Sequence, residues 1–359
     1  METTFAALNS AGWSKENVGS HIIRNNTIHD CGQCGIVGNL GGVFSLIENN
    51  HIYEIGLKRE FWGHEIAAIK LHAAIDVTLK GNHIHHCQHG TWLDWQAQGT
   101  RVTKSLYHNN TRCDLMVEVT HGSCTVDNNI FLSDNALVNQ AQGTAFVNNL
   151  MRGTLFATDM LTRATPYHLA HSTLVMGYAA VYGGDDRLYN NIFTGEVDPI
   201  PDVPCYSFCG AYYDRYNTEK EYKEKLDPGM KYNSLKTYTE VLQPVLLGFN
   251  AYSGNAKPFR EEEKPLSVGG ITTKLIKDGN EWKLSINIPQ EVIDAECPEI
   301  TGESLGTPRV TCQSFENPDG SPLELMEDYF GNTRGNTVLP GPFGSLKVGE
   351  NIFSVWRSR

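Results

Sequence analysis

The feature that most constrains the fold is a short repeat of the form Asn-x-Ile/Leu, often placed within a longer Asn-Asn run. Most successive copies are 20 to 24 residues apart, and Lys104 replaces the asparagine in one of them. One interval of 32 residues contains the extra segment LKREFWGHEI, and another of 42 is close to two periods. A fixed period of this length indicates a solenoid of stacked coils. The apolar members of the repeat are Ile28, Ile52, Ile84, Leu106, Ile130, Leu150 and Ile192.

The composition of each period distinguishes helical from β solenoids. Each period is rich in Asn, Gly and His and contains short strands such as GTWLD and LMVEV. No apolar pattern with a spacing of 3.6 residues is long enough for a helix, and the L-x-x-L-x-L pattern of leucine-rich repeats is absent. We therefore predict an all-β parallel β-helix, in which inward side chains stack and repeated asparagines form ladders at the corners.

The repeat ends near residue 200, which suggests three regions. We expect residues 14–200 to form the β-helix with the catalytic site, and residues 201–265 to form an irregular linker with a short helix. We expect residues 266–359 to form a β-rich region, partly a small sandwich and partly a return to the helix. In this region, apolar and polar residues alternate around Asp278-Gly279-Asn280, which predicts a β-hairpin.

The overall composition excludes several classes of partner. Lys and Arg number 29 against 41 Asp and Glu, a net charge of −12, and no basic stripe offsets it, so we expect no nucleic acid partner. No apolar run is long enough to span a membrane and no signal peptide is recognisable, so we expect a soluble cytoplasmic protein without membrane contact. The nine cysteines are scattered, which favours reduced thiols, and we expect neither a metal nor a cofactor.

One polar column crosses five predicted coils. Aligning the coils on their repeat places Asn39, His72, Asp94, Glu118 and Asn139 at equivalent strand positions. Asp94 and Glu118 are 24 residues apart, about one coil, so the strand spacing of ~4.8 Å predicts carboxyl groups roughly 5 Å apart. Retaining glycosidases hold their two carboxyl groups about 5–5.5 Å apart, whereas inverting enzymes hold them about 6.5–9.5 Å apart. The repeat therefore predicts a retaining pair.

The two carboxyl groups are expected to have different roles. Stacked carboxylates repel, so one should have a raised pKa and hold a proton; we assign Glu118 as the acid and Asp94 as the nucleophile. Aromatic and amide side chains on the same coils suit a sugar-binding surface. The alternative is that both carboxylates are solvated groups on an exposed sheet face. The expected substrate-binding residues are His64, Glu65, His72, Trp92, Trp95, Gln96, Arg101 and His121.

Four segments, GHEIAAIKLHAAID, GTWLDWQAQGTRV, LMVEVTHG and PYHLAHST, resemble the core of the glycoside hydrolase family 120 β-xylosidases. The resemblance implies a right-handed parallel β-helix accompanied by a small β-sandwich. It also implies that Asp94 is the nucleophile, that Glu118 is the general acid/base, and that His64 and Glu65 contact the substrate. Such an enzyme releases xylose from xylo-oligosaccharides with retention and without an organic cofactor. Family members are longer on the N-terminal side, so we expect N-terminal coils to be missing here.

Two other classes of function remain open. The first is another β-helix carbohydrate enzyme, such as a fucosidase, a xylanase or a polysaccharide lyase, although pectate-type lyases need a Ca²⁺-binding carboxylate cluster and a basic catalytic residue. Only Arg101 could supply that base, and no acidic cluster lies beside it in the sequence. The second is an inactive, glycan-binding β-helix fragment. The expected partner is a small oligosaccharide, and an exposed coil end could support a homo-oligomer.

Overall fold

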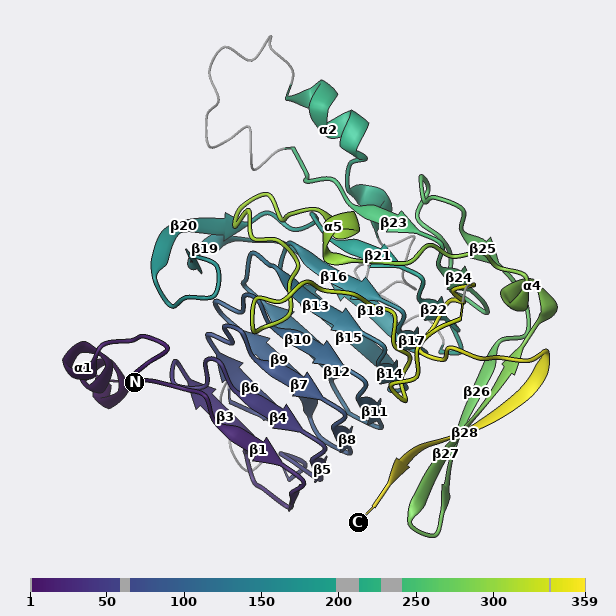
Figure 1. Cartoon of the computed structure of the whole chain (residues 1–359), viewed down its shortest axis with the longest axis horizontal. Helices are drawn as coiled ribbons and strands as arrows, with labels where there is room; N and C mark the ends of the chain where they lie inside the picture. Colours follow the sequence, from purple (N-terminus) through teal and green to yellow (C-terminus); the bar gives the residue numbers. More distant parts are fainter. Residues whose placement is uncertain (1, 59–64, 198–212, 227–240, 336, 359) are drawn as a thin grey trace.

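The computed structural model describes residues 2–58, 65–197, 213–226, 241–335 and 337–358. Its main body is a stack of coils that form three parallel sheets, called here A, B and C: the first six coils add one strand to each sheet, and later coils add strands to A and B (Figure 1). Strands of successive coils pair in parallel in every one of these sheets, for example Ile22 with Leu46 and Leu46 with Thr78. The predicted all-β parallel β-helix is therefore confirmed.

Sheet A has eight short strands: β1 (Ile22–Arg24), β4 (Leu46–Glu48), β7 (Thr78–Lys80), β10 (Arg101–Thr103), β13 (Cys124–Asp127), β16 (Thr144–Val147), β21 (Arg187–Tyr189) and β23 (Leu246–Gly248). Sheet B has nine: β2 (Thr27–His29), β5 (His51–Tyr53), β8 (His83–His85), β11 (Leu106–His108), β14 (Ile130–Phe131), β17 (Leu150–Met151), β22 (Ile192–Phe193), β24 (Ala251–Tyr252) and β25 (Leu266–Ser267). Sheet C has six: β3 (Cys34–Asn39), β6 (Ala67–His72), β9 (His89–Asp94), β12 (Cys113–Glu118), β15 (Asn135–Gln140) and β18 (Thr154–Ala157).

Two antiparallel units accompany the coils. The first is a hairpin of β19 (Met160–His168) and β20 (Val175–Val181), which follows the last strand of sheet C. The second is a C-terminal sheet of β26 (Thr272–Asp278), β27 (Glu281–Ile288) and β28 (Gly349–Arg357). The hairpin predicted around Gly279 is confirmed, since Asp278 pairs with Glu281. The helices are short: α1 (Glu2–Ala11), α2 (Glu219–Lys225), α4 (Gln290–Ile293) and α5 (Gly302–Leu305).

An asparagine ladder lies at the corner between sheets A and B, as the repeat predicted. The Asn26 amide donates to Asn50 at 3.0 Å, and Asn50 donates to Asn82 at 3.1 Å. Ser105 interrupts the run, which resumes with a bond of 3.1 Å between Asn129 and Asn149 and continues to Asn191 and Asn250. Because each amide also bonds to backbone groups, the ladder satisfies polar atoms that the corner buries.

The repeat changes register by one residue after the third coil. Ile28, Ile52 and Ile84 pair with one another and point into the core. Leu106, by contrast, pairs with His83, and Tyr107 takes the inward position opposite Ile84. The reason is that the apolar residue lies two positions after the ladder residue in the first three coils, as Ile28 does after Asn26, but directly after it in later coils, as Ile130 does after Asn129. The outward residues are Leu106, Ile130, Leu150 and Ile192.

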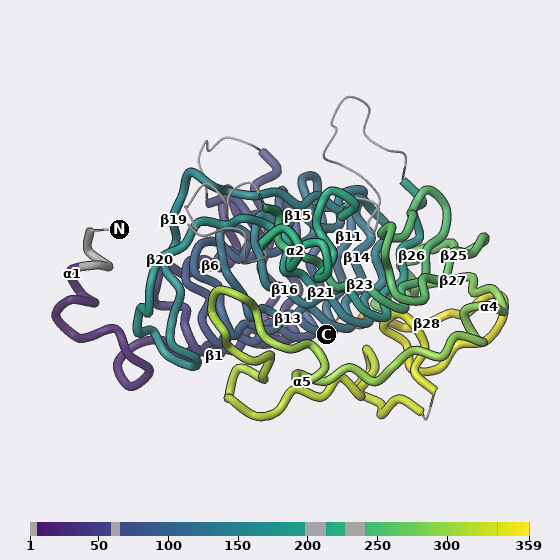
Figure 2. Tube along the Cα trace, turned by 90° about the horizontal axis from the view of Figure 1, so that it is seen from above, coloured from purple at the N-terminus to yellow at the C-terminus, as the bar shows by residue number. Residues whose placement is uncertain are grey.

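C-terminal segments cover the outer faces of sheets A and B. The three-stranded sheet packs Leu284, Ile286 and Val355 against the outward residues of sheet B, so it forms a sandwich with the β-helix itself. Ile300, Phe315 and neighbouring residues pack against sheet A, along the yellow-green segment at the bottom of Figure 2. These two segments therefore do not cover the outer face of sheet C.

The parallel sheets continue beyond residue 200, where the sequence suggested a boundary. The chain first forms α2. Strand β23 then adds to sheet A and strand β24 to sheet B, and Asn250 extends the ladder. The repeat is hard to follow here because the sequence between β22 and β23 is longer than one coil. In the described residues, no helix is both long and apolar enough to cross a membrane.

Candidate active site

Asp94 and Glu118 occupy equivalent positions at the ends of two neighbouring strands of sheet C. Asp94 on β9 pairs with Glu118 on β12, and His72 on β6 pairs with Asp94. Leu93 and Val117 precede the two acids and are fully buried in the core, so strand alternation turns both carboxyl groups to the outer face. The strand spacing of ~4.8 Å makes the two side chains immediate neighbours.

The prediction that Asn139 is the fifth member of the polar column is wrong. Glu118 pairs with Gln140, whereas Asn139 pairs with Val117 and points inward. The Asn139 amide donates to Asp186 at 2.9 Å inside the coil, where it is fully buried. The step from β12 to β15 is one residue longer than the alignment assumed, and a shift of one residue moves a strand side chain to the other face.

The surroundings of Asp94 favour its charged form. Its Oδ2 lies 2.8 Å from the Lys70 ammonium and 2.8 Å from His72 Nε2. Burial raises the pKa of Asp94, but the hydrogen bonds from His72 and Lys70 and the lysine charge together outweigh burial, so the pKa falls below its ordinary value. Its Oδ1 accepts no hydrogen bond from the described residues. One oxygen is thus held, and the other is unengaged.

The surroundings of Glu118 favour its protonated form. Burial and the charge of Asp94 raise the pKa of Glu118, opposed by the hydrogen bond from Trp92 and the charge of Arg163. The Trp92 indole donates to Oε2 at 2.8 Å, and the Arg163 guanidinium lies 3.3 Å from Oε1. Two stacked carboxyl groups whose pKa values move in opposite directions can divide the roles of nucleophile and acid.

Lys70 and Arg163 belong to this site although the sequence did not single them out. Lys70 is fully buried, with its ammonium 3.2 Å from the centre of the Trp92 ring and 3.3 Å from Glu65. A lysine within the apolar strand AAIKLH, two residues before His72, was a usable signal because strand alternation turns both outward. Arg163 lies on β19, outside the repeat, and no sequence pattern pointed to it.

The expected substrate-binding residues fall into separate groups. Glu65, His72 and Trp92 surround the acid pair, and His72 Nε2 lies 3.5 Å from Glu65. Trp95 lies beside this group, with the Arg163 guanidinium 5.9 Å from the centre of its ring. His64 lies outside the described residues.

Gln96 and His121 hold the β19–β20 hairpin. The Gln96 side chain lies 2.9 Å from His168 Nε2, and His121 Nε2 lies 3.2 Å from the Thr165 carbonyl oxygen. His121 is buried, which lowers its pKa to about 4. These contacts fix the hairpin that brings Arg163 to Glu118.

Arg101 lies on a different face of the β-helix. It is on β10 of sheet A, where its guanidinium pairs with Asp127 at 2.8 Å and donates to Asn317 at 2.7 Å. It therefore ties the C-terminal segment to sheet A and does not join the carboxyl pair.

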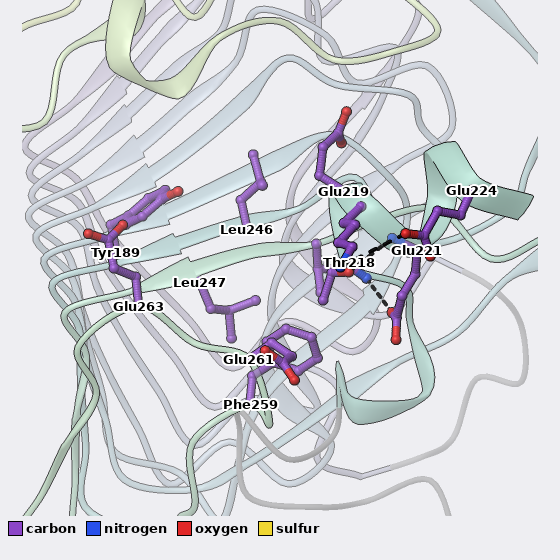
Figure 3. Close-up of a pocket in the computed structure, with 12 residues that line it drawn as sticks. Tyr189, Thr218, Glu219, Glu221, Glu224, Leu246, Leu247, Phe259, Glu261 and Glu263 are labelled. Carbon is purple, nitrogen blue, oxygen red and sulfur yellow. Dashed lines mark hydrogen bonds and ion pairs between the residues drawn. The ribbon is translucent and has the colours of Figure 1, made fainter. Parts of the chain in front are cut away.

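A hollow lies near the end of the stack, between α2 and strands β21 and β23 (Figure 3). Its volume is about 530 Å³, and Glu219, Glu221, Glu224, Glu261 and Glu263 line it together with Leu246 and Phe259. Glu221 is paired with Arg260 at 2.6 Å and caps α2 through Thr218. Glu219 is likewise paired with Lys223 and Arg309, so these two glutamates have structural partners.

Comparisons with known proteins agree with the fold. A family model described as "Right handed beta helix region" matches residues 3–154. A solved structure of XylC in complex with xylose is 45% identical, with a TM-score of 0.90, and the match covers 99% of this chain. It covers 55% of the XylC chain, so this chain spans about half the length of that protein. No curated protein matches significantly.

Proposed function

We propose that this chain, a right-handed parallel β-helix that is 45% identical to XylC, is a retaining exo-β-1,4-xylosidase. The observation that carries the proposal is the pairing of Asp94 with Glu118 in one register position, with pKa values shifted in opposite directions. The complex of XylC with xylose supports a pentose as the sugar.

In the first step, Asp94 attacks the anomeric carbon and Glu118 protonates the departing oxygen. Lys70 and His72 bind Oδ2 of Asp94, which leaves Oδ1 as the attacking atom. Trp92 donates to Oε2 of Glu118 at 2.8 Å, whereas Oε1 has only the longer contact of 3.3 Å with Arg163, so we assign the proton to Oε1. The products are a xylosyl ester on Asp94 and the free leaving sugar.

In the second step, the ionised Glu118 removes a proton from water, whose oxygen attacks the anomeric carbon of the ester. Asp94 leaves as a carboxylate, again stabilised by Lys70 and His72. Two inversions give net retention, and Glu118 recovers its proton. No atom outside the chain, the substrate and water is needed in this scheme.

The two roles can be separated by comparing substrates with good and poor leaving groups. Asp94→Ala should lower kcat by several orders of magnitude on both 4-nitrophenyl β-D-xyloside and xylobiose, since every substrate needs the nucleophile. Glu118→Ala should slow the first step far more with xylobiose than with 4-nitrophenyl β-D-xyloside, because nitrophenolate leaves without a proton. Circular dichroism and melting temperature verify that each variant folds.

The outcome also distinguishes the alternatives. Near-full activity of either variant on xylobiose would contradict the assignment of both residues. Preference for a fucoside, or cleavage within long xylan chains, would identify another β-helix carbohydrate enzyme. A folded protein that binds xylobiose in calorimetry but does not hydrolyse it would indicate a glycan-binding role.

A further inference from the structure

A group of histidines lies on the outer face of sheet B, on a different sheet from the carboxyl pair. His51 is on β5, His83 and His85 are on β8, and His108 is on β11, so three successive coils contribute. The rings form two parallel stacks. His51 and His83 are stacked with ring centres 4.8 Å apart, and His85 and His108 with ring centres 4.7 Å apart.

Imidazole nitrogens of the two stacks face each other. His51 Nε2 lies 2.9 Å from His85 Nε2, and His83 Nε2 lies 2.9 Å from His108 Nε2. The ligand nitrogens form two overlapping triads: those of His51, His83 and His85 all lie within 4.8 Å of one another, and so do those of His85, His86 and His108. Two nitrogens bound to one tetrahedral zinc are about 3.3 Å apart when each Zn–N bond is about 2.0–2.1 Å. Small side-chain movements would bring the rings to that separation.

The hydrogen bonds of the metal-free cluster are incomplete. His108 Nδ1 lies 2.7 Å from Asn109 Oδ1, so Nδ1 donates and Nε2 presents a lone pair to His83. If His83 carries its hydrogen on Nε2, its buried Nδ1 is an acceptor without a donor among the described residues. If the hydrogen is on Nδ1, two Nε2 lone pairs face each other at 2.9 Å. A cation beside the Nε2 atoms removes that repulsion.

The environment suits neutral imidazole ligands. His83, His85 and His108 are buried and His51 is partly buried, and burial favours the neutral form of an imidazole. Trp282 and Trp356 of the C-terminal sheet pack on the cluster, with ring centres 4.7 Å from His108 and 5.2 Å from His83 respectively. An all-imidazole ligand set favours Zn²⁺, Ni²⁺ or Cu²⁺ over Ca²⁺ or Mg²⁺, which prefer oxygen.

We propose that His51, His83, His85 and His108 form a binding site for one transition-metal ion of the Zn²⁺ type. The ion links three coils beneath the two tryptophans and stabilises the attachment of the C-terminal sheet. The neighbouring His86, which is exposed and lies 2.7 Å from His85 through the two Nδ1 atoms, gives the ion a route from solvent. This site is independent of the glycosidase proposal, because its residues lie on another sheet.

The test uses the full chain without a histidine tag, stripped with EDTA and titrated with ZnCl₂ by calorimetry. We expect one Zn²⁺ per chain and a melting temperature that rises when the metal is added. Ni²⁺ or Cu²⁺ should quench the fluorescence of the adjacent tryptophans. Binding of no Zn²⁺ by the folded wild-type chain would overturn the proposal.

Variants taken from neighbouring coils should remove the ligands without disturbing the stack. His85→Tyr copies Tyr53, which stacks on His85 from the preceding coil, and His83→Leu copies Leu106, its partner in the next coil. Each should weaken Zn²⁺ binding by about tenfold or more. His29→Gln is the matched control, because His29 stacks on Tyr53 but belongs to neither histidine triad.

A gain of affinity provides a second readout that does not depend on losing a ligand. Lys277 lies over the Trp282 ring at 5.5 Å and acts electrostatically on His51, His83 and His85. Lys277→Gln removes a positive charge that repels the ion, so it should tighten Zn²⁺ binding. Unchanged affinity in both His85→Tyr and Lys277→Gln would contradict a site at this cluster.

Discussion

Asp94 and Glu118 illustrate how equivalent positions on two coils acquire different chemistry. Both are outward residues at the end of a sheet C strand, and both are largely buried. Asp94 has a lysine and a histidine at 2.8 Å, whereas Glu118 has an indole and a half-exposed arginine. The difference between the two acids therefore arises from the residues of adjacent coils and from the β19–β20 hairpin.

Arg163 should set the alkaline limit of activity. Its charge opposes the rise in the pKa of Glu118, so Arg163→Gln should raise that pKa further. Because the alkaline limb of kcat/KM reports loss of the proton from the acid, this limb should move to higher pH, with the acidic limb in place. The pH dependence of kcat/KM on xylobiose tests this.

Arg152→Gln is the matched control for Arg163→Gln. Arg152 pairs with Asp134 at a distance of 2.8 Å, and this ion pair does not involve Asp94 or Glu118. Its profile should match that of the wild-type chain. An alkaline limb that stays in place, or moves to lower pH, in Arg163→Gln would contradict the contact with Glu118.

At the level of elements, the residues of the asparagine ladder gave the period of the repeat. The sequence pattern placed the coils and put Asp94 beside Glu118, because both depend only on coil length. It misplaced Asn139 because the step from Glu118 to the next coil is one residue longer than the alignment assumed, and it missed the outward turn of Leu106 because Leu106 directly follows the ladder residue Ser105. Such shifts depend on corner hydrogen bonds, which residue spacing does not specify.

The ladder should contribute measurably to stability. Asn129 is fully buried, and its amide donates to Val102 and Asn149, so Asn129→Ala leaves buried carbonyl and amide groups without partners. We expect a loss of about 1–3 kcal/mol in the free energy of unfolding, measured by urea denaturation.

Asn26→Ala at the exposed end of the same ladder is the control. Its amide donates to Asn50 where water can replace it, so we expect a change of about 0.5 kcal/mol or less. Equal losses for the two variants would indicate that burial does not determine the value of a ladder bond.

At the level of the whole molecule, the C-terminal third determines which outer faces of the β-helix are covered. Residues near Ile300 and Phe315 cover sheet A, the three-stranded sheet covers sheet B, and the acid pair lies on sheet C. The sequence predicted a β-rich C-terminal region and its hairpin. It could not predict which face each segment covers, because that depends on contacts such as Arg101 with Asn317, 216 residues apart.

Hydrolysis of 4-nitrophenyl β-D-xyloside, followed by proton NMR from the first minutes, tests the central claim most directly. Two carboxyl groups on adjacent strands should act by double displacement, so β-xylose should appear first and then equilibrate to the α anomer. The initial appearance of α-xylose would mean a single displacement by water, and it would contradict the assignment of Asp94 as the nucleophile.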